Sequence, residues 1–222
     1  MLFRSSKARS GRCVVFDLDG TLIDSREDLA IAVNMMRNEF GLPPLSLETV
    51  VSHVGDGVKK LVQRALQDEK VDLETAYAVI NKFYRINLIN KTTLYPGVFE
   101  GVNALKDAGW SLALISNKPT EFCRIILDHF RIELAFSHII GGGPEFPLKP
   151  DPASLNFVLE STKSVAAKSW VMGDNHTDLE AGIRAGMKRC YAAFGFGDPK
   201  DKSYDLKVDS FKDFVSALSK EQ

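Results

Sequence analysis

The feature that most constrains the fold is an alternation of short apolar runs with segments of helical periodicity. After a first run at Val14–Phe16, each later run is too short for a helix and is bounded by glycine, asparagine or aspartate. These later runs lie at Ser111–Ile115, Ala135–Ile140, Trp170–Met172 and Cys190–Ala193. Helical patterns separate them at Val98–Ala108, Glu121–His129, Pro152–Glu160 and Leu179–Ala185. The alternation predicts an α/β fold with a doubly wound, mainly parallel sheet, covered by helices on both faces.

The stretch from Ser25 to about Thr92 breaks this alternation, because helical periodicity appears there without strand-like runs. Leu29, Val33 and Met36, for example, fall on one face of a predicted helix. A segment of this size is marginal as an independent domain but can pack against a neighbour. We therefore expect a helical insert over residues 24–92, carried by an α/β domain of residues 1–23 and 93–222.

Composition and charge limit the classes of partner. The 222 residues are 45% hydrophobic and 26% charged, with a net charge of −1 and a pI of about 6.4. A nearly neutral chain does not favour nucleic acid or an acidic membrane surface, so we expect a small ligand. No apolar run approaches the length of a membrane span, and the first twelve residues do not resemble a secretory signal.

The cysteines point to a reducing compartment. The three of them, Cys13, Cys123 and Cys190, are far apart and form no C-x-x-C pair, so they give no zinc site. We expect a cytoplasmic protein. Its oligomeric state is not indicated by the sequence.

Two carboxylates follow the first apolar run. Asp17 and Asp19 stand two positions apart, so in extended backbone their side chains point the same way beyond the end of the strand. Carboxylates this close repel each other unless a cation accompanies them, and a hard divalent ion with oxygen ligands, Mg²⁺, is the cation we expect. The alternative is an aspartate-rich turn that closes the strand.

Later strand ends carry groups that suit phosphoryl transfer. Ser116 and Asn117 follow the second run, Lys149 follows the third, and Asp174 and Asp178 follow the fourth. Because the carboxyl ends of parallel strands share one edge of the sheet, a single phosphate site explains all of them. Taken singly, each has a structural alternative: a turn for Ser116 and Asn117, a solvated charge for Lys149, and helix caps for Asp174 and Asp178.

This set of groups predicts a two-step reaction. Asp17 attacks phosphorus and forms an aspartyl-phosphate. Asp19 protonates the leaving oxygen and then takes a proton from water, a role worth roughly 10²–10⁴-fold. Asp174 completes the metal site with Asp17 and Asp19, and Asp178 steadies the loop or a metal-bound water. Lys149 and Mg²⁺ offset the repulsion between the nucleophile and the phosphate.

Four motifs, in this order, resemble those of the haloacid dehalogenase superfamily of phosphohydrolases: D-L-D-G-T from Asp17, I-S-N-K-P from Ile115, L-K-P-D-P from Leu148 and G-D-N-H-T-D from Gly173. The resemblance runs from about Cys13 to a C-terminal helix and implies a Rossmann-like core with an α-helical cap. It also implies that Asp19 binds the metal through its backbone carbonyl. Thr21, Ser116, Asn117 and Lys149 then hold the phosphate. Asn175 departs from the pattern, in which serine is more common.

The insert adds an expectation about the substrate. Its segment Val54–Val58 resembles the V-G-x-G loop of the superfamily members that hydrolyse 2-phosphoglycolate, although His53 replaces the tryptophan common in that group. We therefore expect Gly55, Asp56 and Gly57 to line the substrate site, with backbone amides available to its carboxylate. The alternatives are a phosphatase of another small metabolite, a sugar-phosphate mutase, and a non-catalytic module that binds a phosphorylated ligand.

Overall fold

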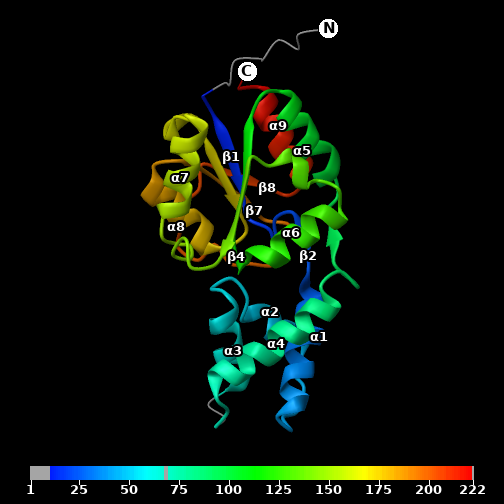
Figure 1. Cartoon of the computed structure of the whole chain (residues 1–222). Helices are drawn as coiled ribbons and strands as arrows, with labels where there is room; N and C mark the ends of the chain where they lie inside the picture. Colours follow the sequence, from blue (N-terminus) through cyan, green and yellow to red (C-terminus); the bar gives the residue numbers. More distant parts are fainter. Residues whose placement is uncertain (1–10, 68–69, 222) are drawn as a thin grey trace, which may run out of the picture.

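The computed structural model describes residues 11–67 and 70–221. Within them, a six-stranded sheet has the order β5-β4-β1-β6-β7-β8, and each adjacent pair is parallel. The strands are β1 (Cys13–Phe16), β4 (Ser111–Pro119), β5 (His138–Gly142), β6 (Trp170–Gly173), β7 (Lys188–Ala192) and β8 (Leu206–Val208). The predicted α/β fold is confirmed (Figure 1).

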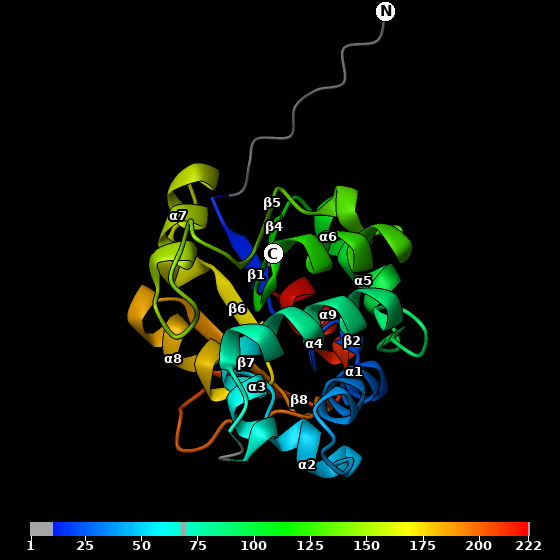
Figure 2. The ribbon, with the colours of Figure 1, turned by 60° about the horizontal axis from the view of Figure 1, so that its bottom comes forward.

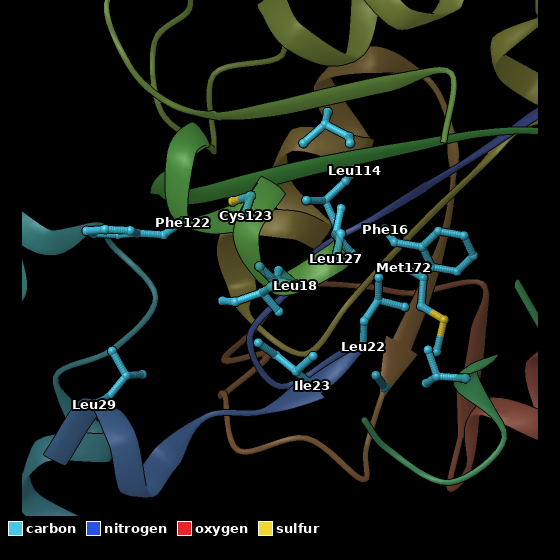
Figure 3. Close-up of a cluster of buried hydrophobic side chains, with 14 of the residues drawn as sticks. Phe16, Leu18, Leu22, Ile23, Leu29, Leu114, Phe122, Cys123, Leu127 and Met172 are labelled. Atoms are coloured by element: carbon cyan, nitrogen blue, oxygen red, sulfur yellow. The ribbon is translucent and has the colours of Figure 1, made fainter. Parts of the chain in front are cut away.

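The central strands are buried on both faces because their side chains alternate between two hydrophobic clusters. In β1, Val14 and Phe16 belong to one cluster, and Cys13 and Val15 belong to the other. Part of the first cluster, around Phe16, is drawn in Figure 3. Next to the sheet, the helices that contribute to this first cluster are α5 (Val98–Asp107), α6 (Thr120–His129) and α9 (Phe211–Ser219). The second cluster is covered by α7 (Ala153–Thr162) and α8 (His176–Ala185).

The segment between β1 and α5 lies beyond one end of the sheet (Figures 1 and 2). Its described helices are α1 (Arg26–Glu39), α2 (Leu47–Ser52), α3 (Val58–Leu66) and α4 (Leu73–Asn87). The chain enters and leaves this helical segment through a short antiparallel pair, β2 (Ile23–Asp24) with β3 (Thr93–Leu94). The first hydrophobic cluster continues from the sheet into the helices, where Leu29, Val33 and Met36 are buried as their spacing predicts. Along the described chain, no helix is long and apolar enough to cross a bilayer.

The main correction to the predicted strands concerns β4. It does not end at Ile115 but continues to Pro119, so Ser116 and Asn117 lie within it. Ile115 pairs with Ile140 and Pro119 pairs with Gly142, so the register shifts between these two pairs. Such a bulge redirects side chains at the end of a strand.

Other boundaries also differ from the predictions. β5 begins at His138 because residues 133–135 form a 3₁₀ turn, η1 (Glu133–Ala135); a second such turn is η2 (Ala166–Lys168). α8 begins at His176, three residues before the predicted Leu179, because Asn175 caps it. The N-cap of α7 is Pro152, and the Asp151 carboxylate before it accepts a hydrogen bond from the Ala153 amide (2.9 Å).

Candidate active site

A cavity of about 240 Å³ lies between the carboxyl ends of the strands and the helical segment. This is below the roughly 300–1,000 Å³ of pockets for drug-sized ligands, so it suits a ligand of few atoms. The predicted site residues that line it are Asp17, Asp19, Gly55, Asp56, Gly57, Ser116, Asn117, Lys149 and Asp174. Asp178 does not line the cavity itself, but it contacts Lys149, which does. Thr21 does not line the cavity: it is fully buried, and its hydroxyl has no partner within the described structure.

Both the side chain and the backbone of Lys149 are fixed by hydrogen bonds. Its ammonium donates to Asp17 Oδ1 (2.8 Å), Asp178 Oδ1 (2.5 Å) and the Ile115 carbonyl (2.7 Å). The Lys149 amide donates to Asn117 Oδ1 (2.8 Å), and Asn117 Nδ2 donates back to the Lys149 carbonyl (3.1 Å). Only 5% of Lys149 is exposed, so this lysine is not a solvated loop charge.

Three buried carboxylates lie close together, and the Lys149 ammonium contacts two of them. Asp17, Asp174 and Asp178 each offer an oxygen, and these oxygens lie within 4.8 Å of one another. Burial raises the pKa of Asp17 to about 6, a rise that Lys149 opposes and Asp178 increases. Burial, together with Asp17 and Asp178, raises the pKa of Asp174 well above its ordinary value. The cluster therefore holds an excess of negative charge that a further cation would relieve, and its all-oxygen donor set fits Mg²⁺.

Asp178 both contacts Lys149 and caps a helix. Its Oδ1 accepts from Lys149, and its Oδ2 accepts from the Asn175 amide (3.2 Å) in a capping box at the start of α8. Because both oxygens are engaged, Asp178 orients Lys149 and α8 while Asp17 and Asp174 face the cavity.

Asp174 is positioned by glycine-rich backbone from two loops. The amides of Phe196 (3.0 Å) and Gly197 (2.7 Å) donate to Asp174 Oδ2. A Cβ on Gly20 would lie 1.7 Å from that same oxygen, and one on Gly195 would lie 2.3 Å from the Gly20 carbonyl. Side chains are therefore excluded where these loops meet Asp174. In the sequence, the stretch Gly195-Phe196-Gly197 resembles a glycine-rich loop of the superfamily or a mobile turn, and neither interpretation predicts its contact with Asp174.

Asp19 faces a different neighbour from Asp17. Its Oδ1 accepts from the Lys118 ammonium (2.7 Å) and from the Ser25 hydroxyl (2.5 Å). Lys118 also donates to the hydroxyl of Tyr84, on α4. Burial disfavours the Lys118 ammonium, but Asp19 and Tyr84 outweigh it and raise the pKa of Lys118. The motif I-S-N-K-P contained this lysine, which lies in the part of β4 between Ile115 and Pro119 where the register with β5 shifts.

The loop before α3 contacts the sheet domain at two points. Asn117 Nδ2 donates to the Gly55 carbonyl (3.0 Å). Gly55 has φ +118°, and a Cβ there would lie 2.5 Å from Asn175 Nδ2; Gly57 has φ +90°, and a Cβ there would lie 2.8 Å from Leu148 Cδ1. Both positions combine a left-handed backbone with close approach, which only glycine accommodates without strain.

Asp56, between these glycines, is turned toward Arg64 and His176 at the cavity rim. It pairs with Arg64 on α3, and its Oδ1 lies 3.9 Å from His176 Nε2. Burial opposes ionisation of Asp56, but Arg64 lowers its pKa. The carboxylate therefore neutralises Arg64 at the rim of the cavity.

Comparisons with known proteins agree with this geometry. Residues 14–192 match the sequence model of the haloacid dehalogenase-like hydrolase family. A phosphoglycolate phosphatase of Aliivibrio fischeri is 33% identical over 219 residues, covering 94% of this chain and 96% of that protein. One from Pseudomonas fluorescens Pf-5 is 36% identical, covering 94% of this chain and 80% of that protein.

A solved structure extends the similarity to three dimensions. It is described as a predicted phosphoglycolate phosphatase from Haemophilus somnus 129pt, and it superposes with a TM-score of 0.88 at 29% identity. The superposition covers 95% of this chain and 97% of the other. The similarity therefore includes the helical segment as well as the sheet.

Proposed function

The chain belongs to the haloacid dehalogenase-like hydrolase family, and we propose that it is a Mg²⁺-dependent phosphatase that hydrolyses 2-phosphoglycolate. The observation that carries this proposal is the pairing of Asp17 with a fully engaged Lys149 at the floor of a small cavity. The names of the relatives support the substrate, and the size of the cavity supports a small one.

In this proposal, Asp17, Asp174 and the backbone carbonyl of Asp19 hold Mg²⁺, which supplies positive charge against the phosphate. A carboxylate oxygen of Asp17 attacks phosphorus as Asp19 donates a proton to the ester oxygen, and the bond from phosphorus to that oxygen breaks. Asp19 then accepts a proton from water, whose oxygen attacks phosphorus and releases phosphate from Asp17. Lys149 keeps its positive charge beside the phosphoryl group throughout.

We also propose that residues 24–92 act as a cap over the core of residues 1–23 and 93–222. The loop of residues 54–58 lies against Asn117 and Asn175, and Gly57 and Val58, where α3 begins, line the same cavity. A cap in this position excludes water and leaves little room for a bulky leaving group.

A kinetic panel tests the function. The wild type is assayed with 2-phosphoglycolate, a hexose 6-phosphate, a nucleoside monophosphate and an aryl phosphate, each with and without Mg²⁺. We expect the highest kcat/KM for 2-phosphoglycolate and no turnover after the metal is removed. A preference for the hexose phosphate or the nucleotide refutes the substrate. Failure to hydrolyse any ester in Mg²⁺ favours the non-catalytic alternative.

A further inference from the structure

Lys118 is a buried cation in the cavity wall with hydrogen-bonding capacity to spare. Its side chain is 5% exposed. An ammonium has three donors, and the described partners of Lys118 Nζ are Asp19 Oδ1 and the Tyr84 hydroxyl. One donor is therefore left for a ligand in the cavity that Lys118 lines.

Two other basic residues of the wall are committed elsewhere, and Lys200, which also lines the cavity, is exposed and its Nζ lies 3.0 Å from His176 Nε2. Lys149 uses its three donors on Asp17, Asp178 and the Ile115 carbonyl. Arg64 pairs with Asp56 and donates to the His53 carbonyl (3.0 Å).

Tyr84 supplies a second donor beside Lys118. Its hydroxyl accepts from the lysine, so its own hydrogen can be donated to a ligand. Burial raises the pKa of Tyr84, which keeps that hydrogen in place. The ring is fixed edge-on against Phe122, with centroids 5.4 Å apart, and the Lys118 ammonium lies 4.7 Å from the ring centroid. The pair forms a rigid donor site between β4 and α4.

We propose that Lys118, together with the Tyr84 hydroxyl, binds the substrate's carboxylate and sets the preference for a phosphate ester whose carboxylate is one methylene from the ester oxygen. This inference rests on the proposed function. In that reaction Asp19 must reach the ester oxygen, and Asp19 Oδ1 lies 2.7 Å from Lys118 Nζ. A charged group one methylene beyond the ester oxygen therefore falls beside Lys118.

The surroundings of the pair favour a carboxylate over a polyol. The wall near Tyr84 continues with the apolar side chains of Leu29, Ala32 and Ile80. These three side chains offer no partner to the hydroxyl groups of a sugar, whose burial without hydrogen bonds is costly. The neighbouring Asn81, which also lines the cavity, already donates its amide to the Tyr77 carbonyl (2.7 Å). A single buried ammonium with an adjacent phenol matches one compact anion instead.

The test compares two substrates that differ in the carboxylate alone. 2-Phosphoglycolate and 2-hydroxyethyl phosphate share a primary alkyl ester, so any loss of Asp19 positioning lowers kcat/KM for both and cancels in their ratio. We expect Lys118→Met to lower the ratio by about 100-fold, because a buried charge pair is lost. Lys118→Gln, which keeps a polar neutral side chain, should lower the ratio by a similar factor and replaces Lys118→Met if that variant does not fold.

Two further variants sharpen the assignment. Tyr84→Phe removes one neutral donor and should lower the ratio by about 3- to 10-fold. Arg64→Met is the matched control, since it removes a different cation from the same wall, and it should leave the ratio within about twofold.

Three outcomes overturn the proposal in distinguishable ways. If Lys118→Met lowers kcat/KM equally for both substrates, Lys118 acts only by positioning Asp19. If the ratio of kcat/KM values collapses in Arg64→Met, Arg64 rather than Lys118 binds the substrate's carboxylate. A wild type that shows no preference for 2-phosphoglycolate over its neutral analogue refutes the proposed substrate itself, whatever the variants do.

Discussion

The two lysines of the cavity differ in which parts of the chain hold them. Lys149 donates only to groups of the sheet domain: Asp17, Asp178 and the Ile115 carbonyl. Lys118 donates to Asp19 of the sheet domain and to Tyr84 of the helical segment. We call Lys149 with its partners the Lys149 end of the cavity, and Lys118 with Asp19 and Tyr84 the Lys118 end. All groups of the Lys149 end come from the sheet domain, whereas the Lys118 end needs both the sheet domain and the helical segment.

We infer from this difference that the two lysines serve different parts of the substrate. The phosphoryl group is common to every substrate of such a site, so the groups that receive it gain from a fixed framework. The leaving group varies between substrates, so the groups that recognise it can come from a cap that closes over it. Changes at the Lys149 end should affect all substrates alike, and changes at the Lys118 end should depend on the leaving group.

The largest effect is expected for Asp17→Asn. The amide is nearly isosteric but cannot attack phosphorus, so kcat should fall by at least about 10⁴-fold for every ester. Steady-state assays in Mg²⁺, with circular dichroism to verify folding, check this. Substantial Mg²⁺-dependent turnover by the folded variant would show that Asp17 is not the nucleophile.

Lys149→Met should lower kcat/KM by about 10³-fold. The factor should be the same for 2-phosphoglycolate and 2-hydroxyethyl phosphate, in contrast to Lys118→Met. Stability should fall as well, because Asp17 and Asp178 lose their shared cation. A loss confined to 2-phosphoglycolate would contradict the division between the two lysines.

Asp19→Asn should lower the rate by about 10²-fold for alkyl esters and less for aryl phosphates, whose leaving groups need no proton. Single-turnover formation of the phosphoenzyme across a series of leaving groups measures this. Equal losses along the series would remove Asp19 from the role of general acid.

The excess charge at the Lys149 end should have a pH signature. Asp17 has a folded-state pKa of about 6, against an ordinary value of 3.8. The folded state therefore binds the Asp17 proton more tightly than the unfolded state does. The resulting stabilisation is fully present below pH 3.8 and is lost as the pH rises to about 6.

In EDTA, the unfolding free energy of the wild type relative to Asp17→Asn should therefore fall by about 1–3 kcal/mol between pH 4 and 6. Denaturant titrations across this range measure the difference, and Mg²⁺ should reduce the fall because it favours the ionised carboxylate. A flat difference would mean that the pKa of Asp17 is not raised in the folded protein.

The smallest effect is expected at the exposed link between cap and core. Arg85 on α4 pairs with Glu121 on α6 close to Tyr84, and both side chains are more than half exposed. Because exposed pairs contribute little, Arg85→Met should change kcat/KM by less than about twofold. A tenfold loss would show that this pair, rather than the buried Lys118–Tyr84 contact, positions the cap.

The contrast between the two ends also explains what the sequence could predict. The residues of the Lys149 end follow apolar runs that mark strand ends, and parallel strands bring those ends to one edge. Asp17, Ser116, Lys149 and Asp174 could therefore be placed together from the order of the residues alone. The charge pattern also indicated the need for a cation there.

No such pattern in the sequence places Lys118 and Tyr84 together. Lys118 lies where the register between β4 and β5 shifts, and apolar runs do not reveal such a shift. Tyr84 lies in a helix whose periodicity predicts burial but not a partner in the other part of the chain. The phosphate-binding role of Thr21 stays a prediction, because its side chain is fully buried and does not line the cavity.

The proposed covalent intermediate on Asp17 can be tested by trapping it directly. Wild-type enzyme is mixed with Mg²⁺ and excess 2-phosphoglycolate, quenched in acid during the first turnovers, digested, and the peptide that contains residue 17 is weighed. We expect a phosphoryl adduct on Asp17 in the wild type and its absence in Asp17→Asn. A wild type that hydrolyses the substrate under these conditions without ever carrying phosphate on Asp17 would contradict the proposed mechanism.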